Sequence, residues 1–365
     1  MRILTLNPKL EYNFLKKEIQ NSILKTLENG QYILGKNVKK FEDDFSKFIG
    51  TKYCCGLSSG TDALICSLKA LGIKKNDEVI TVSHTAVATI SSIVEVGATP
   101  KFVDINKDNY LIDLNKIKQN VTKKTKAIIF VHLYGYPINF NNIKIFLRKK
   151  KIKIIEDCSQ AHGARINKVK VGTIGDIGCF SFYPTKNIGA LGDAGAVTTN
   201  NLSLLKKIKL LREYGWLKKN FSKLHGTNNR LDEIQACILN IKLKYFKKFN
   251  NLRKKISLRY QKNINNNLII VPKLVKSIDH ANHLFVIRVM KNKRDKLRKF
   301  LYKNGFDCMI HYPYPAHKQN AYKKFSKNKL TNTDKISKEI LSLPIYPLLT
   351  AKQQNKLIKL INIFK

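Results

Sequence analysis

The sequence predicts an α/β protein with a large domain, in which a mostly parallel sheet is flanked by helices, and a smaller C-terminal α+β domain. Short apolar runs alternate with helical periods over the first 250 residues, a pattern typical of a parallel sheet with crossover helices. The pattern changes after about residue 250. The length of 365 residues is enough for one large domain and a smaller one. We therefore expect domains at residues 1–250 and 251–365.

The strands predicted for the large domain are short, apolar and rich in Val and Ile. A helix follows the first of them in TAVATISSIVEVG and ends at Gly97, because glycine commonly terminates helices. The predicted strands are DEVITVS (77–83), TPKFVDI (99–105), AIIFVHLYG (127–135) and KIKIIEDCSQ (151–160).

The C-terminal part has a different order of elements. NLRKKISLRYQKNI (251–264) predicts a long linking helix, and HANHLFVIRVM (280–290) predicts a strand. KNKRDKLRKFLYKNG predicts a helix that ends at Gly305, and FDCMIHY (306–312) predicts a further strand. Because these segments do not repeat the regular alternation of the first part, we expect them to form the small α+β domain.

The charge of the chain is strongly positive, with 68 Lys and Arg against 25 Asp and Glu and a net charge of +43. The lysines are spread along the chain among Asn and Ile, as in LKKIKLL and FKKFNNLRKKI. No helix-turn-helix, zinc-finger or aromatic RNA-binding signature is visible. We interpret the charge as a bias of composition on solvent faces rather than as a nucleic-acid site. Such a field still helps to collect an anionic small substrate.

Other features concern the cellular compartment. No apolar run reaches the length of about 18 residues that a membrane span needs, and the start, MRILTLNPKLEYNFLKKEI, lacks the pattern of a signal peptide. The seven cysteines are odd in number and form no CxxC pair. We therefore expect no disulfide framework, no metal site and no membrane, and a cytoplasmic protein.

One lysine stands in an unusual context, within SFYPTKNIGALGDAGAV (181–197). Lys186 lies among aromatic and small residues and glycines. It could be one more solvated lysine, a clamp for a phosphate group, or a nucleophile held inside a pocket. Ser181 precedes it by five residues, and the glycines that follow indicate a close approach of the backbone.

Two other segments predict polar groups near a ligand. Asp157 follows an apolar strand and so lies near its carboxyl end, the edge at which ligands bind in open α/β sheets. SSGTDALICSLKALG (58–72) places Gly60 and Thr61 at the start of a helix, where free N–H groups can bind an anion. A turn carboxylate and an ordinary capped helix are the structural alternatives.

Together these features match the chemistry of one cofactor. An anion site, a carboxylate for a ring nitrogen and a buried lysine suit pyridoxal 5'-phosphate. A lysine becomes nucleophilic when burial lowers its pKa, and it can then form a Schiff base with an aldehyde. An aspartate beside the pyridine nitrogen keeps that nitrogen protonated, so that the ring withdraws electrons from the substrate.

Nearly the whole chain resembles the DegT/DnrJ/EryC1/StrS family of sugar aminotransferases, which have the aspartate-aminotransferase-like (type I) fold. Single motifs are weak, but their order and spacing are specific. The matching segments are NGQYILGKNVKKFEDDFSKFIGTKYCCGLSSGTDAL, NDEVITVS, EDCSQAHGA, GDIGCFSFYPTKNIGALGDAGAV, GTNNRLDEIQACIL and HYPYPAHKQNAY.

The resemblance implies a role for individual residues. Lys186 matches the lysine that binds the cofactor and moves the proton, and Asp157 matches the partner of the pyridine nitrogen. Gln160 matches a residue beside the phenolic oxygen of the ring. Gly60, Thr61 and Ser181 match the phosphate cradle.

Four further positions match less directly. Asn228 matches an asparagine that reaches the phosphate of the neighbouring subunit, which implies a homodimer with shared active sites. His311 and Tyr312 match a loop near the sugar nucleotide. Many relatives carry an aromatic residue that stacks on the ring, whereas Ala86 occupies that place here. His84 is therefore a candidate contact of the cofactor, and a hydrogen-bonded structural histidine is the alternative.

The implied reaction moves an amino group from L-glutamate to a keto-deoxy sugar linked to a nucleoside diphosphate, for amino sugars of surface polysaccharide such as lipopolysaccharide or O-antigen. The loop HYPYPAHKQNAY is most similar to relatives that act on dTDP-linked 3-keto-6-deoxyhexoses. A 4-keto sugar nucleotide is the alternative substrate. A non-catalytic regulatory homologue or a nucleic-acid-binding protein is the alternative function.

Overall fold

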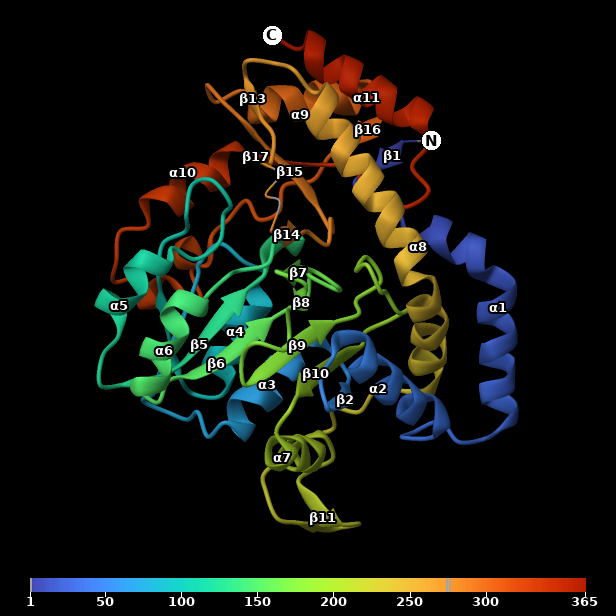
Figure 1. Ribbon diagram of the computed structural model, residues 1–365, viewed down its shortest axis with the longest axis vertical. Helices are drawn as coiled ribbons and strands as arrows, with labels where there is room; N and C mark the ends of the chain where they lie inside the picture. Colours follow the sequence, from blue (N-terminus) through green and yellow to red (C-terminus); the bar gives the residue numbers. More distant parts are fainter. Residues whose placement is uncertain (1, 274, 276) are drawn as a thin grey trace.

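The computed structural model describes residues 2–273, 275 and 277–365. Its centre is a seven-stranded sheet with the order β2-β10-β9-β6-β5-β3-β4 (Figure 1). All neighbours in it are parallel except those of β10, which runs antiparallel to β2 and β9. The predicted α/β class with a mostly parallel sheet is confirmed. The strands of this sheet are β2 (Tyr53–Leu57), β3 (Glu78–Thr81), β4 (Thr99–Phe102), β5 (Thr125–Val131), β6 (Lys153–Asp157), β9 (Ile177–Ser181) and β10 (Gly195–Thr199).

Helices cover the sheet in two apolar clusters. One cluster packs α3, α4, α6 and α7 on the strands, and the other packs α2 and α8 on β9 and β10. No helix in the described part of the chain combines the length and the apolar character needed to cross a membrane. The helices are α1 (Pro8–Glu28), α2 (Lys36–Ile49), α3 (Gly60–Ala70), α4 (Val87–Glu95), α5 (Ile117–Asn120), α6 (Asn141–Lys149), α7 (Leu202–Arg212), α8 (Glu233–Asn263), α9 (Arg294–Lys303), α10 (Thr331–Glu339) and α11 (Ala351–Ile363).

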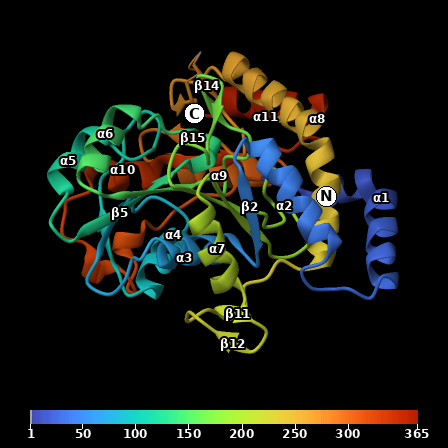
Figure 2. The ribbon, with the colours of Figure 1, turned by 60° about the horizontal axis from the view of Figure 1, so that its bottom comes forward.

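A second apolar core lies in the C-terminal part. The antiparallel sheet β13-β15-β17 packs there with α9, α11 and the C-terminal half of α8. A hairpin of β11 and β12 projects from the molecule beyond α7 (Figure 2). The remaining strands are β1 (Ile3–Leu4), β7 (Arg165–Ile166), β8 (Val169–Lys170), β11 (Trp216–Lys218), β12 (Phe221–Ser222), β13 (Ile269–Ile270), β14 (Ile278–Asp279), β15 (Phe285–Val289), β16 (Phe306–Asp307) and β17 (Ile340–Leu343).

The helix α8 is longer than the linking helix expected at residues 251–264, because it begins at Glu233. No glycine or proline interrupts the sequence from Glu233 to Asn263, so the helix continues from one core to the other. Figure 1 shows α1 packed alongside its first half. The predicted domain boundary after residue 250 falls inside this helix and stays a prediction.

The strand expected at residues 306–312 is much shorter in the structure. β16 contains only Phe306–Asp307, which pairs in parallel with β1. Beyond it, Met309 N donates to Thr5 Oγ1 at 2.9 Å, and the His311 carbonyl accepts a hydrogen bond from the Tyr134 hydroxyl. Met309 also forms an isolated antiparallel bridge with Ser342 of β17, so the pairing partner of the chain changes after β16.

Candidate active site

A cavity of about 220 Å³ lies at the carboxyl ends of β6 and β9. These two strands are parallel neighbours, so their last residues, Asp157 and Ser181, meet at the same edge of the sheet. The cavity therefore occupies the place at which the sequence predicts a ligand. The predicted site residues that line it are Gly60, Thr61, Asp157, Gln160, Ser181 and Lys186.

One end of the cavity is formed by the start of α3. Ser59 is the N-cap of this helix, and its Oγ accepts a hydrogen bond from Asp62 N at 3.0 Å. Within the described residues, the N–H groups of Gly60 and Thr61 donate to no protein acceptor. A Cβ at Gly60 would lie 2.5 Å from Ser181 Cβ, so a larger residue would close this end. The arrangement provides free N–H donors and a helix dipole for an anion.

Asp157 is held in place by two donors at the end of β6. Thr89 Oγ1 donates to Asp157 Oδ2 at 2.9 Å, and Ser159 N donates to Oδ1 at 3.2 Å. The carboxylate is 5% exposed and lines the cavity. A carboxylate with few protein donors retains lone pairs for a protonated ring nitrogen. Thr89, in the first turn of α4, was missed in the sequence.

Lys186 lies in a tight turn after β9. Its backbone N–H donates to Tyr183 O at 2.8 Å, and a Cβ at Gly189 would lie 2.4 Å from Pro184 O, so the turn requires glycine there. The side chain faces the cavity, and burial lowers the pKa of Lys186 to about 8, while the charge of Asp157 acts in the opposite direction. A usable fraction of the amine, about a tenth at pH 7, is therefore neutral.

This lowered pKa predicts how the Lys186 amine reacts in the cofactor-free protein. Its acetylation by a limiting reagent should rise about tenfold per pH unit below pH 8 and level off above it, because only the neutral amine is nucleophilic. Mass spectrometry of the Lys186 peptide, with a model lysine peptide in the same tube, measures the profile. A rate that still rises steeply at pH 10 would show that the amine is solvated.

Gln160 belongs to a hydrogen-bond network beside the cavity. Its Oε1 accepts from Tyr134 N and its Nε2 donates to Tyr312 Oη, each at 2.7 Å. The Tyr134 hydroxyl donates to His311 O and lies 2.8 Å from His84 Nε2. This network joins Gln160, which lines the cavity, to three further predicted residues that do not line it, namely His84, His311 and Tyr312. Tyr134 was not predicted.

His84 is fully buried beside Tyr134, and its ring is perpendicular to that of Tyr134. Thr85, Ala86 and Ala88 line the cavity in this region. Burial lowers the pKa of His84 to about 4, so the imidazole is neutral. Its contact with the cofactor ring stays a prediction.

Asn228 lies apart from the cavity of its own chain. It is exposed and forms an isolated antiparallel bridge with Glu213. The residues that line the cavity do not include it. Its predicted contact therefore requires a second chain and stays a prediction.

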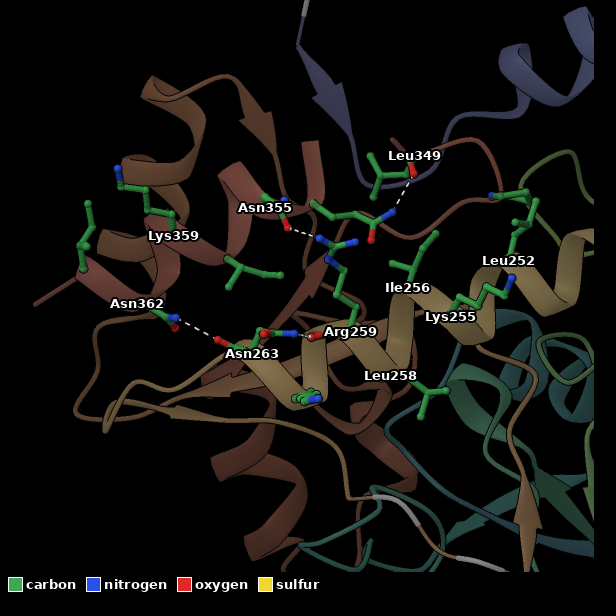
Figure 3. Close-up of a pocket in the computed structure, with 15 residues that line it drawn as sticks. Leu252, Lys255, Ile256, Leu258, Arg259, Asn263, Leu349, Asn355, Lys359 and Asn362 are labelled. Carbon is green, nitrogen blue, oxygen red and sulfur yellow. Dashed lines mark hydrogen bonds between the residues drawn. The ribbon is translucent and has the colours of Figure 1, made fainter. Parts of the chain in front are cut away.

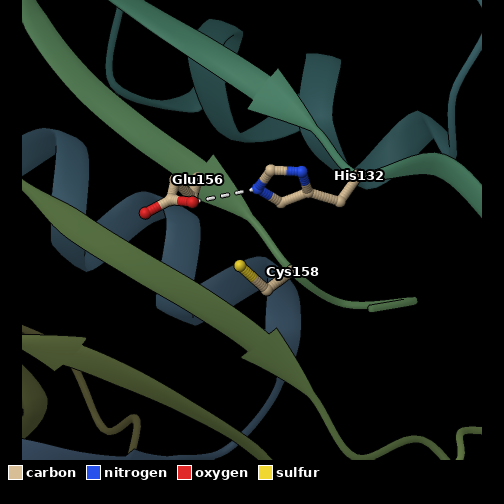
Figure 4. A group of neighbouring side chains, drawn as sticks. All are labelled: His132, Glu156 and Cys158. Carbon is tan, nitrogen blue, oxygen red and sulfur yellow. Dashed lines mark hydrogen bonds and ion pairs between the residues drawn. The ribbon is translucent and has the colours of Figure 1, made fainter. Parts of the chain in front are cut away.

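His132, which lines the cavity, forms a buried cluster with Glu156 and Cys158 (Figure 4). Their potential ligand atoms all lie within 4.8 Å of one another. The nitrogen and oxygen atoms among them, however, already form hydrogen bonds within the protein. Ile138 N donates to His132 Nδ1, so the Nε2–H donates to Glu156 Oε2, each at 3.0 Å. Glu156 Oε1 accepts from the N–H groups of residues 174 and 175 at 2.8 Å. These hydrogen bonds attach the loops that contain residues 138, 174 and 175 to β6.

A larger cavity, of about 940 Å³, is an open groove between α8 and α11 (Figure 3). Arg259 crosses it and donates to Asn355 Oδ1 at 2.5 Å. None of the residues predicted for the site lines this groove. Size alone does not define an active site, and the smaller cavity contains the reactive groups.

The smaller cavity fits pyridoxal 5'-phosphate. The unpaired N–H groups of Gly60 and Thr61 suit its phosphate, and the lack of a side chain at Gly60 lets the start of α3 lie directly against Ser181. Lys186 supplies an amine for the aldehyde, and Asp157 supplies a carboxylate for the pyridine nitrogen.

Comparisons of the sequence and of the structure with known proteins all match aminotransferases. Residues 13–362 match the model of the DegT/DnrJ/EryC1/StrS aminotransferase family. The chain is 42% identical to the dTDP-3-amino-3,6-dideoxy-alpha-D-galactopyranose transaminase of Aneurinibacillus thermoaerophilus, over 95% of each chain. It is similar to the crystal structure of S. venezuelae DesV in complex with a ketimine intermediate, with a TM-score of 0.95, 35% identity and coverage of 99% and 98%. The structure of NtdA from Bacillus subtilis with bound cofactor PMP has a TM-score of 0.90, 32% identity and coverage of 96% and 81%.

Proposed function

The chain belongs to the DegT/DnrJ/EryC1/StrS aminotransferase family, and from this premise we propose that it moves an amino group from L-glutamate to a keto-deoxy sugar linked to a nucleoside diphosphate. It is an aminotransferase that uses pyridoxal 5'-phosphate. One observation carries the proposal: the amine of Lys186, the carboxylate of Asp157 and the anion cradle at Gly60 line one cavity.

Each residue of the site has a separate role in this proposal. When bound, the cofactor supplies an aldehyde that exchanges amines and a ring that withdraws electrons. Gly60, Thr61 and Ser181 would hold the phosphate. The Asp157 carboxylate would accept a hydrogen bond from the ring nitrogen and keep a proton there. Gln160, fixed by its bonds to Tyr134 N and Tyr312 Oη, would lie beside the ring hydroxyl.

Lys186 Nζ is the group that moves the proton. Its lowered pKa of about 8 leaves enough neutral amine to accept a proton from the substrate carbon, and the resulting ammonium can return it. Both halves of the reaction use this step, first with L-glutamate and then in reverse with the keto sugar.

The preferred acceptor is a dTDP-linked 3-keto-6-deoxyhexose, and a 4-keto sugar nucleotide is the alternative. The relative from Aneurinibacillus thermoaerophilus, a transaminase named for a dTDP-3-amino sugar, supports the first. Tyr312 accepts a hydrogen bond from Gln160, which lines the cavity, and the His311 carbonyl accepts one from Tyr134. These contacts support the proposed position of both residues near the sugar. We place the enzyme in the cytoplasm, in the synthesis of amino sugars for surface polysaccharide such as lipopolysaccharide or O-antigen.

The acceptor is tested with a panel of 3-keto and 4-keto sugars linked to dTDP or UDP, each incubated with L-glutamate and the holoenzyme. NMR of the product should show the new amine at C3 of the dTDP sugar. An amine at C4 would favour the alternative substrate. No amino sugar from any member, together with salt-dependent binding to random DNA, would favour the nucleic-acid-binding alternative.

We also propose a homodimer in which Asn228 binds the phosphate in the partner's cavity. Asn228 is exposed and does not line the cavity of its own chain. The nearby hairpin of β11 and β12 projects from the molecule (Figure 2) and exposes Leu217 and Phe221 at 59% and 55%. Exposed apolar side chains on such a projection favour contact with another protein surface.

Asn228→Ala should weaken retention of the cofactor without removing its covalent attachment. A hydrogen bond to a charged phosphate contributes roughly 1.5–3 kcal/mol, which corresponds to about one to two orders of magnitude in the dissociation constant. Titration of the cofactor-free protein measures it, and Asn251→Ala, an exposed asparagine in α8, is the control. Unchanged affinity, or a fully active monomer in sedimentation, would contradict the shared site.

A further inference from the structure

Asn187 directly follows Lys186 and joins the turn to the C-terminal part of the chain. The Asn187 side chain is 5% exposed. Its Nδ2 donates to Ala281 O at 2.7 Å, and its Oδ1 lies 3.2 Å from His283 Nδ1. Both partners belong to the segment His280–Leu284, which leads into β15. The residue next to the reactive lysine is therefore attached at two points to a distant segment.

The hydrogen bonds also define the protonation of His283. Because Ala281 O accepts from the Asn187 amide nitrogen, the Asn187 oxygen must face His283. This oxygen can only accept, so His283 Nδ1 carries a proton and donates it. Burial lowers the pKa of His283 well below its ordinary value, and the charges of Lys186 and Arg253 add to this effect. The ring is thus a neutral donor.

The same segment also contacts the turn that fixes Gln160, a residue that lines the cavity. Ala281 N donates to Gly135 O at 2.9 Å, and Leu284 N donates to Tyr134 O at 3.2 Å. Tyr134 N in turn donates to Gln160 Oε1 at 2.7 Å. The segment 280–284 therefore connects the turn that carries Lys186 with the turn that fixes Gln160.

We propose that Asn187 and His283 are a positioning pair, which fixes the turn of Lys186 against the segment 280–284 and keeps the Lys186 amine inside the cavity. The inference rests on the proposed role of Lys186. Neither residue lines the cavity, so the pair acts through the backbone of the turn. Its loss would let the turn move and water reach the amine.

The test compares three variants of the full-length protein. Asn187→Ala removes both hydrogen bonds. His283→Leu replaces the ring with an apolar side chain of similar size and so removes the donor. His283→Asn is smaller but offers an amide N–H near the position of Nδ1. Because the last two variants separate the hydrogen bond from the packing, they keep the test valid even if Asn187→Ala fails to fold.

The main readout is the apparent pKa of the Lys186 amine, measured by competitive acetylation of the cofactor-free protein. Asn187→Ala and His283→Leu should raise it from about 8 toward 10.5, the value without burial. His283→Asn should leave it near 8. Hydrogen exchange of the amides in residues 183–191 should become faster in the first two variants only. A misplaced lysine should also lower kcat by about 10- to 100-fold, with a smaller effect on KM.

Two results would overturn the proposal. One is an unchanged pKa in both Asn187→Ala and His283→Leu. The other is a rise in His283→Asn with none in His283→Leu, which would show that the ring acts by packing. Because acetylation needs no turnover, a failure of the pair is distinguishable from a failure of the proposed aminotransferase reaction, which the substrate panel tests.

Discussion

Lys186→Ala should abolish amino transfer, with a loss of roughly a thousandfold or more in kcat. Only a primary amine at this point of the cavity can both attach the cofactor and move the proton. The fold should persist, because alanine fits the turn, in which the Lys186 N–H donates to Tyr183 O. Steady-state rates with L-glutamate, together with a thermal melt, measure both effects.

Two further variants sharpen this expectation. Lys186→Arg keeps a positive charge but has no neutral amine near physiological pH, so it should be as inactive as alanine. Lys149→Ala, which alters an exposed lysine in α6, should have the rate of the unchanged protein. Turnover of Lys186→Ala within a few-fold of the unchanged protein would contradict the role of Lys186.

Asp157→Asn should slow the reaction of the holoenzyme with L-glutamate by roughly 100-fold or more. The amide can still accept the hydrogen bond from Thr89 Oγ1, so the local structure should persist. It cannot stabilise a positive charge on the ring nitrogen, so the proton on the substrate carbon becomes less acidic. Stopped-flow spectroscopy of the first half-reaction measures the rate.

A matched carboxylate change separates this effect from the loss of one charge. Asp108→Asn alters an exposed aspartate and should leave the rate unchanged. An Asp157→Asn protein that reacts at the normal rate would show that another group holds the proton on the ring nitrogen.

The central strands could be predicted because local sequence determines them. β5 and β6 are short runs of Ile and other apolar residues that are buried on both faces, and such runs are typical of a parallel sheet. The short pairs β7 with β14 and β1 with β16 could not be predicted, because each contains two residues and depends on partners more than 100 positions away. Local patterns carry no signal for such pairs.

The residues of the site also divide into those that the sequence predicts and those that only the folded chain reveals. Lys186, Asp157 and Gly60 were predicted from chemistry that short motifs display, and the structure brings them to one cavity. Tyr134 was missed, because it has a φ of 60°, a backbone conformation that its residue type disfavours. Contacts with Gln160 and the segment 280–284 stabilise that conformation, and these contacts exist only in the folded chain.

One measurement tests the central claim most directly: reduction of the holoenzyme with borohydride, followed by peptide mapping, with and without prior addition of L-glutamate. We predict that the cofactor is fixed to one lysine, Lys186, and that L-glutamate given first prevents this labelling, because the amino acid displaces the lysine. Labelling at another lysine, or labelling of Lys186 that L-glutamate does not reduce, would contradict the account.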